Sequence, residues 1–404
     1  LKISIRGRFM SKRVFVTGIG IISGIGKNVE ETLQSLIEGK SGVREIQYLR
    51  TNHKGTIPVS EVKFSEEELI EMAGVPAGEP YTRSTLIGMV AAAEAVKSAR
   101  ISDIKDKRTG LISGTTVGGM DKSEHYYHDL LNTNNHIEYI ETHDCGDSTE
   151  RIADYIGVKD FVSTTSTACS SAANSMILGS RMIKNGMLDR VIAGGIESLT
   201  RYHMNGFNTL MILDRETCKP FDENRKGLNL GEGAAFVVLE SEESVKESGK
   251  KVLAELTGYG NSCEAFHQTA STPEGKGAYA AMKEALDRSG LKPEQIDYIN
   301  AHGTGTENND LSEGRAIQTL FGSNPPKISS TKSYTGHTTS AAGGVEAVIS
   351  ILAIQHNMIF PNLNFKQQMK ELSFKPVTEL LRDVKVDHVL SNSFGFGGNN
   401  SALI

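Results

Sequence analysis

The chain has 404 residues, of which 38% are hydrophobic and 23% charged, and its formal net charge is −6. This composition is typical of a soluble globular protein, not of a disordered or membrane protein. The acidic balance gives no general reason to bind nucleic acid or anionic lipid, and no apolar run reaches the roughly 18 residues of a membrane span. We therefore expect neither a nucleic-acid partner nor a membrane partner.

Strands and helices alternate along the chain. "RVFVTGIGIISGIG" (13–26) is a β-branched run that breaks into glycines, which predicts a buried strand entering a turn. "NVEETLQSLIEGKSGV" (28–43) has apolar residues at helical spacing. The pattern continues with a helix over 83–101, a strand and glycine turn over 108–120, and a short buried strand over 188–198. This alternation favours an α/β protein with a mostly parallel sheet covered by helices.

Two sequence patterns occur twice, in the same order. "KRVFVTGIG" (12–20) is similar to "KVLAELTGYG" (251–260), and the apolar helix after residue 168 is similar to the one after residue 336. They suggest a duplicated α/β unit, although on periodicity alone chance similarity explains them equally well. Because 404 residues exceed what one core usually supports, about 250–300, we expect two units. We assign 1–10 to an N-terminal extension, 11–250 to the first half and 251–404 to the second.

The chain has only four cysteines, Cys145, Cys169, Cys218 and Cys263. Their wide spacing matches neither a disulfide framework nor a paired metal-ligand motif. A reducing, cytoplasmic location is therefore expected.

One of these cysteines lies between hydroxyl residues and a predicted helix, in "STTSTACSSAANSMILGSRMI" (163–183). A helix N-terminus offers free N–H groups and partial positive charge, which favour the thiolate of Cys169. The small neighbours would let a thioester approach the backbone, whose N–H groups can form an oxyanion hole. A buried structural cysteine fits this stretch alone equally well.

Two further stretches contain histidines at the ends of predicted elements. "YINAHGTGTENNDLSEGRA" (298–316) predicts a strand that ends at His302, a flexible Gly/Thr loop, and a helix that begins near Asp310 and Glu313. A capping or loop histidine is the alternative. "KISSTKSYTGHTTSAAGGVEAV" (327–348) predicts a strand, then Lys332, then His337 at the mouth of a helix.

A buried lysine is costly unless it is paired. We therefore expect Lys332 to form a buried ion pair with Glu313 that orients both histidines, with a solvated loop charge as the alternative. The chain end, "LSNSFGFGGNNSALI" (390–404), alternates Phe and Gly. This alternation is typical of a hinge with bulky gating side chains or of an ordinary glycine turn.

"STACSSA", "NAHGTGT", "STKSYTGH" and "SNSFGFGG", in this order and at these separations, resemble the motifs of the condensing enzymes. The similarity is to the elongating β-ketoacyl-acyl carrier protein synthases, and it covers nearly the whole chain from Met10. It implies a thiolase-like fold, with two similar five-stranded α/β halves in an α-β-α-β-α arrangement.

The resemblance implies an acyltransferase with a Cys-His-His triad that acts without a cofactor. Cys169 would attack an acyl-carrier-protein thioester, with the N–H groups of Cys169 and Phe396 as the oxyanion hole. His302 and His337 would stabilise the enolate that forms as malonyl-carrier protein loses carbon dioxide. That carbanion would attack the acyl-enzyme and give a product two carbons longer, as in fatty acid synthesis.

The same resemblance implies roles for further residues. Lys332, Glu313 and Asp310 would hold the histidine network, Thr304 and Thr306 would bind the pantetheine arm, and Phe396 would be a gate with Phe394 beside it. In some members, the positions of Asn300, Glu346 and Asn392 surround a structural monovalent cation. The resemblance also implies a homodimer, and an acidic carrier protein as partner would need a local basic surface. Candidates for that surface are Arg83, Lys219, Arg225 and Lys226.

Some features narrow the class of synthase, and others leave its pathway open. In the family that the chain resembles, chain-initiating synthases carry Asn where His337 stands, and thiolases use a second cysteine as base. Non-catalytic chain-length partners typically lack a cysteine at position 169. His337 and Cys169 therefore favour an elongating, catalytic synthase. However, the segment 119–162 matches the housekeeping enzymes poorly, and Asn399 stands where many members carry Thr. A specialised ketosynthase of a polyene, pigment or polyketide pathway, and a non-catalytic carrier-protein-binding subunit, are the alternatives.

Overall fold

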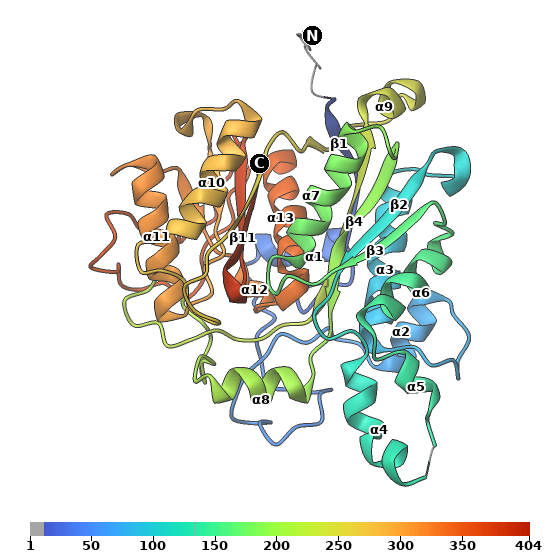
Figure 1. The fold of residues 1–404 in the computed structure, drawn as a ribbon. Helices are drawn as coiled ribbons and strands as arrows, with labels where there is room; N and C mark the ends of the chain where they lie inside the picture. Colours follow the sequence, from blue (N-terminus) through green and yellow to red (C-terminus); the bar gives the residue numbers. More distant parts are fainter. Residues whose placement is uncertain (1–11, 134) are drawn as a thin grey trace, which may run out of the picture.

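The protein is described by a computed structural model that covers residues 12–133 and 135–404, so the expected extension at 1–10 lies outside the described residues (Figure 1). The strands and helices predicted near the N-terminus and around residue 190 are confirmed. Within the described ranges, every helix is too short or too polar to span a lipid bilayer.

The strands form two mixed sheets. The first has six strands in the order β3-β2-β4-β5-β1-β6, and the second has five in the order β7-β11-β10-β8-β9. Both contain antiparallel pairs, such as β1 with β5 and β10 with β11, so the expectation of a mostly parallel sheet is only partly met. The first sheet has one strand more than the expected five, because the two-residue β6 pairs with β1. The strands are β1 Val14–Ser23, β2 Thr109–Gly114, β3 Phe161–Thr165, β4 Arg190–Glu197, β5 Gly233–Ser241, β6 Ala254–Glu255, β7 Tyr259–Cys263, β8 Tyr298–Asn300, β9 Lys327–Ser329, β10 Val389–Phe394 and β11 Asn399–Leu403.

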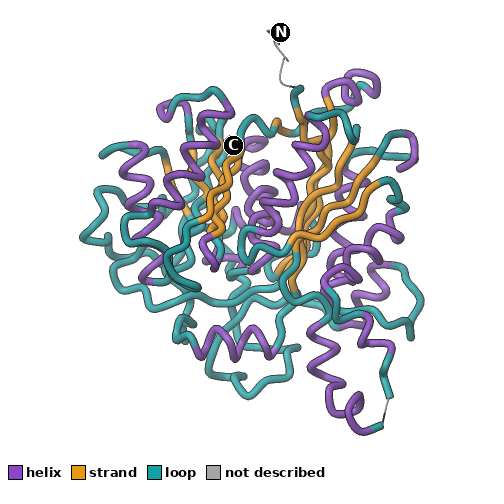
Figure 2. The backbone as a smooth tube through the Cα atoms, in the orientation of Figure 1, coloured by secondary structure: helices purple, strands orange, loops and turns teal. Residues whose placement is uncertain are grey.

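Helices separate and cover the two sheets in five layers (Figures 1 and 2). α7 (Ser171–Lys184) and α13 (Ala342–His356) lie between the sheets, and their apolar side chains share one core with both. α13 is buried from Ala342 to Ala353, as expected for a helix that is apolar on all sides. α3 (Arg83–Ser98) and α6 (Cys145–Ile156) cover the first sheet, and α10 (Lys276–Ser289) and α11 (Glu307–Phe321) cover the second. This arrangement confirms the thiolase-like α-β-α-β-α fold.

The repeated T-G-x-G pattern has the same role in both halves. A Cβ atom at Gly20 would collide with the backbone carbonyl of Ala91 in α3. A Cβ atom at Gly260 would collide in the same way with the carbonyl of Ala281 in α10. Each glycine therefore lets an outer helix approach its sheet closely. This shared packing favours duplication over chance similarity.

The remaining helices do not belong to the pairs named above, and one of them, α12, is fully buried. α4 and α5 project from the body of the molecule (Figure 1). They lie within residues 119–162, the segment that we expect to differ from the housekeeping enzymes. These helices are α1 Val29–Ile37, α2 Glu66–Ala73, α4 Met120–Asn132, α5 Glu138–Glu141, α8 Arg201–Thr209, α9 Glu242–Ser248 and α12 Lys332–Thr335.

Candidate active site

Cys169 lies in a tight turn between β3 and α7. Ala168 has a φ of +51°, a left-handed conformation that costs a non-glycine residue energy and clusters at functional sites. Ser171 holds the turn, because its hydroxyl accepts from the backbone N–H of Thr167 at 2.9 Å and donates to the carbonyl of Ala168 at 2.7 Å. The turn places the buried Cys169 side chain just before the first residue of α7.

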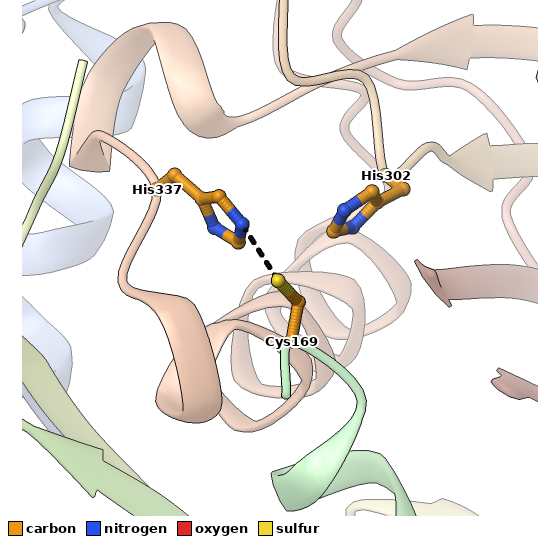
Figure 3. A group of neighbouring side chains, drawn as sticks. All are labelled: Cys169, His302 and His337. Atoms are coloured by element: carbon orange, nitrogen blue, oxygen red, sulfur yellow. Dashed lines mark hydrogen bonds between the residues drawn. The ribbon is translucent and has the colours of Figure 1, made fainter. Parts of the chain in front are cut away.

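The two predicted histidines lie beside this thiol (Figure 3). His337 Nε2 is 3.1 Å from Cys169 Sγ, and the rings of His302 and His337 are 5.3 Å apart at an angle of 85°. One ligand-type atom from each of the three residues lies within 4.8 Å of the others. His302 follows β8 and His337 precedes α13, so both sheets contribute to the site. The structure thus brings together the Cys-His-His triad that the sequence predicts.

Burial controls the protonation of all three groups. It lowers the pKa of His302 and His337 well below the ordinary value, and the positive charge of Lys332 acts in the same direction. Both imidazoles are therefore neutral at neutral pH. Burial raises the pKa of Cys169 to about 11, against the opposing effects of Lys332 and the backbone N–H of Phe396. The expectation that the helix N-terminus favours a thiolate is not met, because desolvation of the thiol outweighs it.

We therefore predict that alkylation of Cys169 by iodoacetamide becomes steadily faster as the pH rises. The thiolate is the reactive species, and a pKa of about 11 leaves only about 0.1% of it at pH 8. The rate should rise about tenfold per pH unit between pH 7 and 10. Intact-mass time courses measure this, with Cys169→Ala to subtract the other cysteines. A plateau below pH 9 would instead indicate a stable thiolate–imidazolium pair.

Lys332 is buried and contacts both Glu346 and His302. Its ammonium pairs with the carboxylate of Glu346 on α13 and donates to the backbone carbonyl of His302 at 2.6 Å. It also lies 3.2 Å from His302 Nδ1. Because an ammonium can only donate, Nδ1 accepts, and the ring proton of His302 is on Nε2. Lys332 thus fixes the tautomer of His302.

The predicted ion pair between Lys332 and Glu313 is wrong. Both oxygens of Glu313 are already bonded, to the backbone N–H groups of His302 at 2.9 Å and Gly303 at 2.8 Å and to the side-chain amide of Asn392 at 3.0 Å. Glu313 therefore positions His302 through its backbone.

Asp310 has a similar role on the adjoining loop. It accepts from the backbone N–H groups of Gly305 at 3.2 Å and Phe221 at 2.7 Å. Burial raises the pKa of both Glu313 and Asp310. The two carboxylates hold the loop that carries His302 and Thr304, as expected for positioning residues.

We predict that Lys332→Met lowers the free energy of unfolding by about 3–5 kcal/mol, because it leaves the Glu346 carboxylate buried without its charge partner. The double variant Lys332→Met/Glu346→Gln should recover part of this loss. Urea unfolding followed by circular dichroism measures both. Lys370→Met, at an exposed lysine, is the matched control and should be as stable as the wild type. A destabilisation equal in the single and double variants would contradict the pairing.

A cavity of about 350 Å³ adjoins Cys169. The ring of Phe396 stacks on Phe207 with 5.7 Å between centroids, and the ring of Phe394 lies 5.9 Å from that of His302. The hydroxyls of Thr304 and Thr306 lie 2.9 Å apart. Phe207 was missed in the sequence, since a lone aromatic residue in "MNGFNTL" carries no distinctive signal. Predicted residues that line the cavity are Cys169, His302, His337, Thr304, Thr306, Phe394 and Phe396.

Only one of the four candidate docking residues is a free surface charge at the cavity. Lys226 is exposed and lines it. The prediction that Arg83 is a docking residue is wrong, because its side chain is largely buried and pairs with Glu232. Arg225 donates to the backbone carbonyls of Thr306 and Glu307, and Lys219 pairs with Glu216.

Two family models match the chain. The model of the beta-ketoacyl synthase N-terminal domain matches residues 11–244, and that of the C-terminal domain matches residues 253–366.

Named relatives and solved structures are similar over almost the full length. A protein of Staphylococcus aureus (strain N315) named 3-oxoacyl-[acyl-carrier-protein] synthase 2 is 34% identical over 98% of both chains. One of the same name from Coxiella burnetii (strain RSA 493 / Nine Mile phase I) is 34% identical over 97% of this chain and 98% of its own. The solved ishigamide ketosynthase/chain length factor is 32% identical with a TM-score of 0.90, covering 97% of this chain and 98% of its own. A beta-ketoacyl synthase from Burkholderia phymatum STM815 is 27% identical with a TM-score of 0.85, covering 97% and 98%.

Proposed function

Because the chain belongs to the β-ketoacyl synthase family, we propose that it is an elongating 3-oxoacyl-[acyl-carrier-protein] synthase. It would condense an acyl group held on Cys169 with malonyl-carrier protein, and release carbon dioxide and a chain two carbons longer. The observation that carries this proposal is the buried triad, with His337 3.1 Å from the thiol and a second neutral histidine beside it.

The first half-reaction transfers the acyl group. As Cys169 Sγ attacks the thioester carbonyl, its proton passes to the neutral His337 Nε2 at 3.1 Å. The backbone N–H groups of Cys169 and Phe396 both oppose the rise in the pKa of the Cys169 thiol, and they would donate to the carbonyl oxygen as it becomes negative. Collapse of this intermediate breaks the carbon–sulfur bond to the carrier, and the proton from His337 neutralises the departing thiolate.

The second half-reaction forms the carbon–carbon bond. Loss of carbon dioxide from the malonyl group leaves an enolate, and the Nε2–H that Lys332 imposes on His302 can donate to it. His337 Nε2 is unprotonated when it accepts the Cys169 proton, so His337 would become the second donor once its ring proton moves from Nδ1 to Nε2. The enolate carbon then attacks the acyl thioester of Cys169, the carbon–sulfur bond breaks, and the Cys169 thiolate that leaves takes up one proton from solvent to restore the thiol. The carrier's pantetheine arm would lie along Thr304 and Thr306, and Phe396 would have to separate from Phe207 to admit a long chain.

The test is intact-mass analysis after incubation with acyl-carrier proteins of graded chain length and unsaturation. We expect a mass gain of one acyl group, which peptide mapping should place on Cys169. The preferred donor would then identify the chain length that the enzyme accepts. Absence of acylation by every donor, with the protein folded, would overturn the proposal and favour a non-catalytic carrier-binding subunit.

A specialised ketosynthase that works with a second, related chain is the other candidate. One observation favours it: Tyr127, Leu131, Ile137 and Ile140, on or beside α4 and α5, are each more than half exposed. Two solved structures with a similar fold are named for a ketosynthase together with a chain length factor. The neighbouring strand β3 is an edge strand with an exposed Val162 and leads directly into the Cys169 turn. A partner thiolase-fold chain, identical or related, would cover this surface, and a homodimer is the simplest case.

Three smaller proposals accompany this function. A monovalent cation would fit near Asn300, Glu346 and Asn392, because Glu346 Oε2 and Asn392 Oδ1 are buried oxygens without a hydrogen-bond partner among the described residues. We also propose a cytoplasmic location, which rests on the four cysteines being free thiols. An acidic carrier protein would dock near Lys226, the exposed basic residue beside the cavity.

A further inference from the structure

We propose that Asn399 is a positioning residue that sets the geometry of the oxyanion hole by tying the Cys169 turn to the Gly395–Gly398 loop. The inference rests on the proposed function, since it concerns how acylation of Cys169 is accelerated. It assigns to Asn399 a specific part in the reaction.

The two oxyanion donors belong to separate parts of the fold. The N–H of Cys169 comes from the turn before α7, and the N–H of Phe396 comes from the loop between β10 and β11. The two segments are in direct contact: a Cβ atom at Gly395 would lie 2.9 Å from the carbonyl of Thr167 and 3.2 Å from the backbone nitrogen of Cys169. No short stretch of backbone fixes the separation of the two donors, so side chains must do so.

Asn399 bonds to both segments. Its backbone carbonyl accepts from the N–H of Gly395 at 2.8 Å, which closes the loop that carries Phe396. Its side-chain Oδ1 accepts from the hydroxyl of Ser170 at 2.8 Å, and Ser170 directly follows the nucleophile. The two residues are 229 positions apart in the chain. The Ser170 hydroxyl also lies 2.7 Å from the carbonyl of Thr167, so its single proton is shared between the turn and Asn399.

Two further amides hold Asn399 in place. Asn174 on α7 donates to Asn399 Oδ1 at 2.9 Å and to the hydroxyl of Thr167 at 2.8 Å. Asn261 on β7 donates to the same Oδ1 at 3.0 Å and to the side-chain oxygen of Asn174 at 2.9 Å. Oδ1 of Asn399 is therefore surrounded by three donors. Bonds from three donors restrain Asn399 Oδ1 to one position.

The test compares two reactions of the same thiol. Acylation by octanoyl-carrier protein builds negative charge on a carbonyl oxygen, whereas alkylation by iodoacetamide forms its bond to sulfur without an oxyanion. Misplacing the donors should slow the first reaction far more than the second, in which the same N–H groups act only on the sulfur. We expect Asn399→Ala to slow acylation about tenfold or more and to change alkylation less than about twofold. Asn399→Asp keeps oxygens that accept the same bonds and should retain most of the acylation rate.

Ser170→Ala removes the link from the other side and should show the same selective loss, which keeps the test valid if Asn399→Ala does not fold. Asn185→Ala, at the far end of α7, is the matched control. Equal slowing of both reactions, or no slowing of acylation, would overturn the positioning role. If the wild-type protein itself is not acylated while its alkylation proceeds, the proposed function fails, and this inference fails with it.

Discussion

Replacing Cys169 by Ala should abolish both acylation and condensation, with a loss of at least about 10⁴-fold in the overall rate. No other described thiol lies within reach of His302 and His337, because the three ligand-type atoms that meet there include only this cysteine. The variant should still release carbon dioxide from malonyl-carrier protein, because both histidines and Lys332 are left in place. Intact-mass analysis for the acyl adduct and a carbon dioxide assay measure the two activities separately.

Cys263→Ala is the matched control, because Cys263 is an exposed thiol on β7 and should be dispensable for condensation. An acyl adduct that persists in Cys169→Ala at the wild-type rate would contradict the assignment of the nucleophile. Loss of decarboxylation together with acylation, in a folded variant, would show that the thiol also holds the histidines in position.

The triad was predictable because each member lies where an element begins or ends. A cysteine before a helix, a histidine after a short strand and a histidine before an apolar helix are all visible as changes in periodicity. Taken singly, each pattern also fitted an ordinary structural residue. Four motifs in a fixed order made the assignment to the family specific. The fold that they imply brings Cys169 and His337 together from positions 168 residues apart.

The partners of the triad were harder to predict, because ion pairs depend on contacts between distant elements. Glu313 was a reasonable partner for Lys332 until the structure showed its oxygens bonded to the backbone of His302 and Gly303. The true partner, Glu346, is the single carboxylate in the apolar helix α13. A lone charge in a helix that is otherwise buried signals an internal cation, and this signal could have identified the pair.

The burial of Arg83 and the amide network around Asn399 could not be predicted from the sequence, for the same reason. Arg83 has the sequence context of an exposed helix start, yet Glu232, 149 positions away, pairs with it in the interior. The amide network of Asn174, Asn261 and Asn399 likewise joins three elements that are far apart in the chain. Polar residues of this kind have no periodicity, so only tertiary structure shows which of them meet.

Replacing His302 by Ala should separate the two half-reactions. The base nearest to Cys169 Sγ is His337 at 3.1 Å, so the acyl-enzyme should form at close to the wild-type rate. Decarboxylation of malonyl-carrier protein should slow by about 10²–10³, the usual effect of removing one donor to a developing oxyanion. The fold should survive, since Glu313 bonds to the backbone N–H of residue 302 and Lys332 keeps Glu346 as its charge partner.

Mass analysis of the adduct and carbon dioxide release measure the two rates, and His302→Gln, which keeps a side-chain N–H donor, should recover part of the rate of decarboxylation. Equal losses in both half-reactions would instead place His302 in the acyl transfer itself, and would require the proton of Cys169 to pass through both histidines.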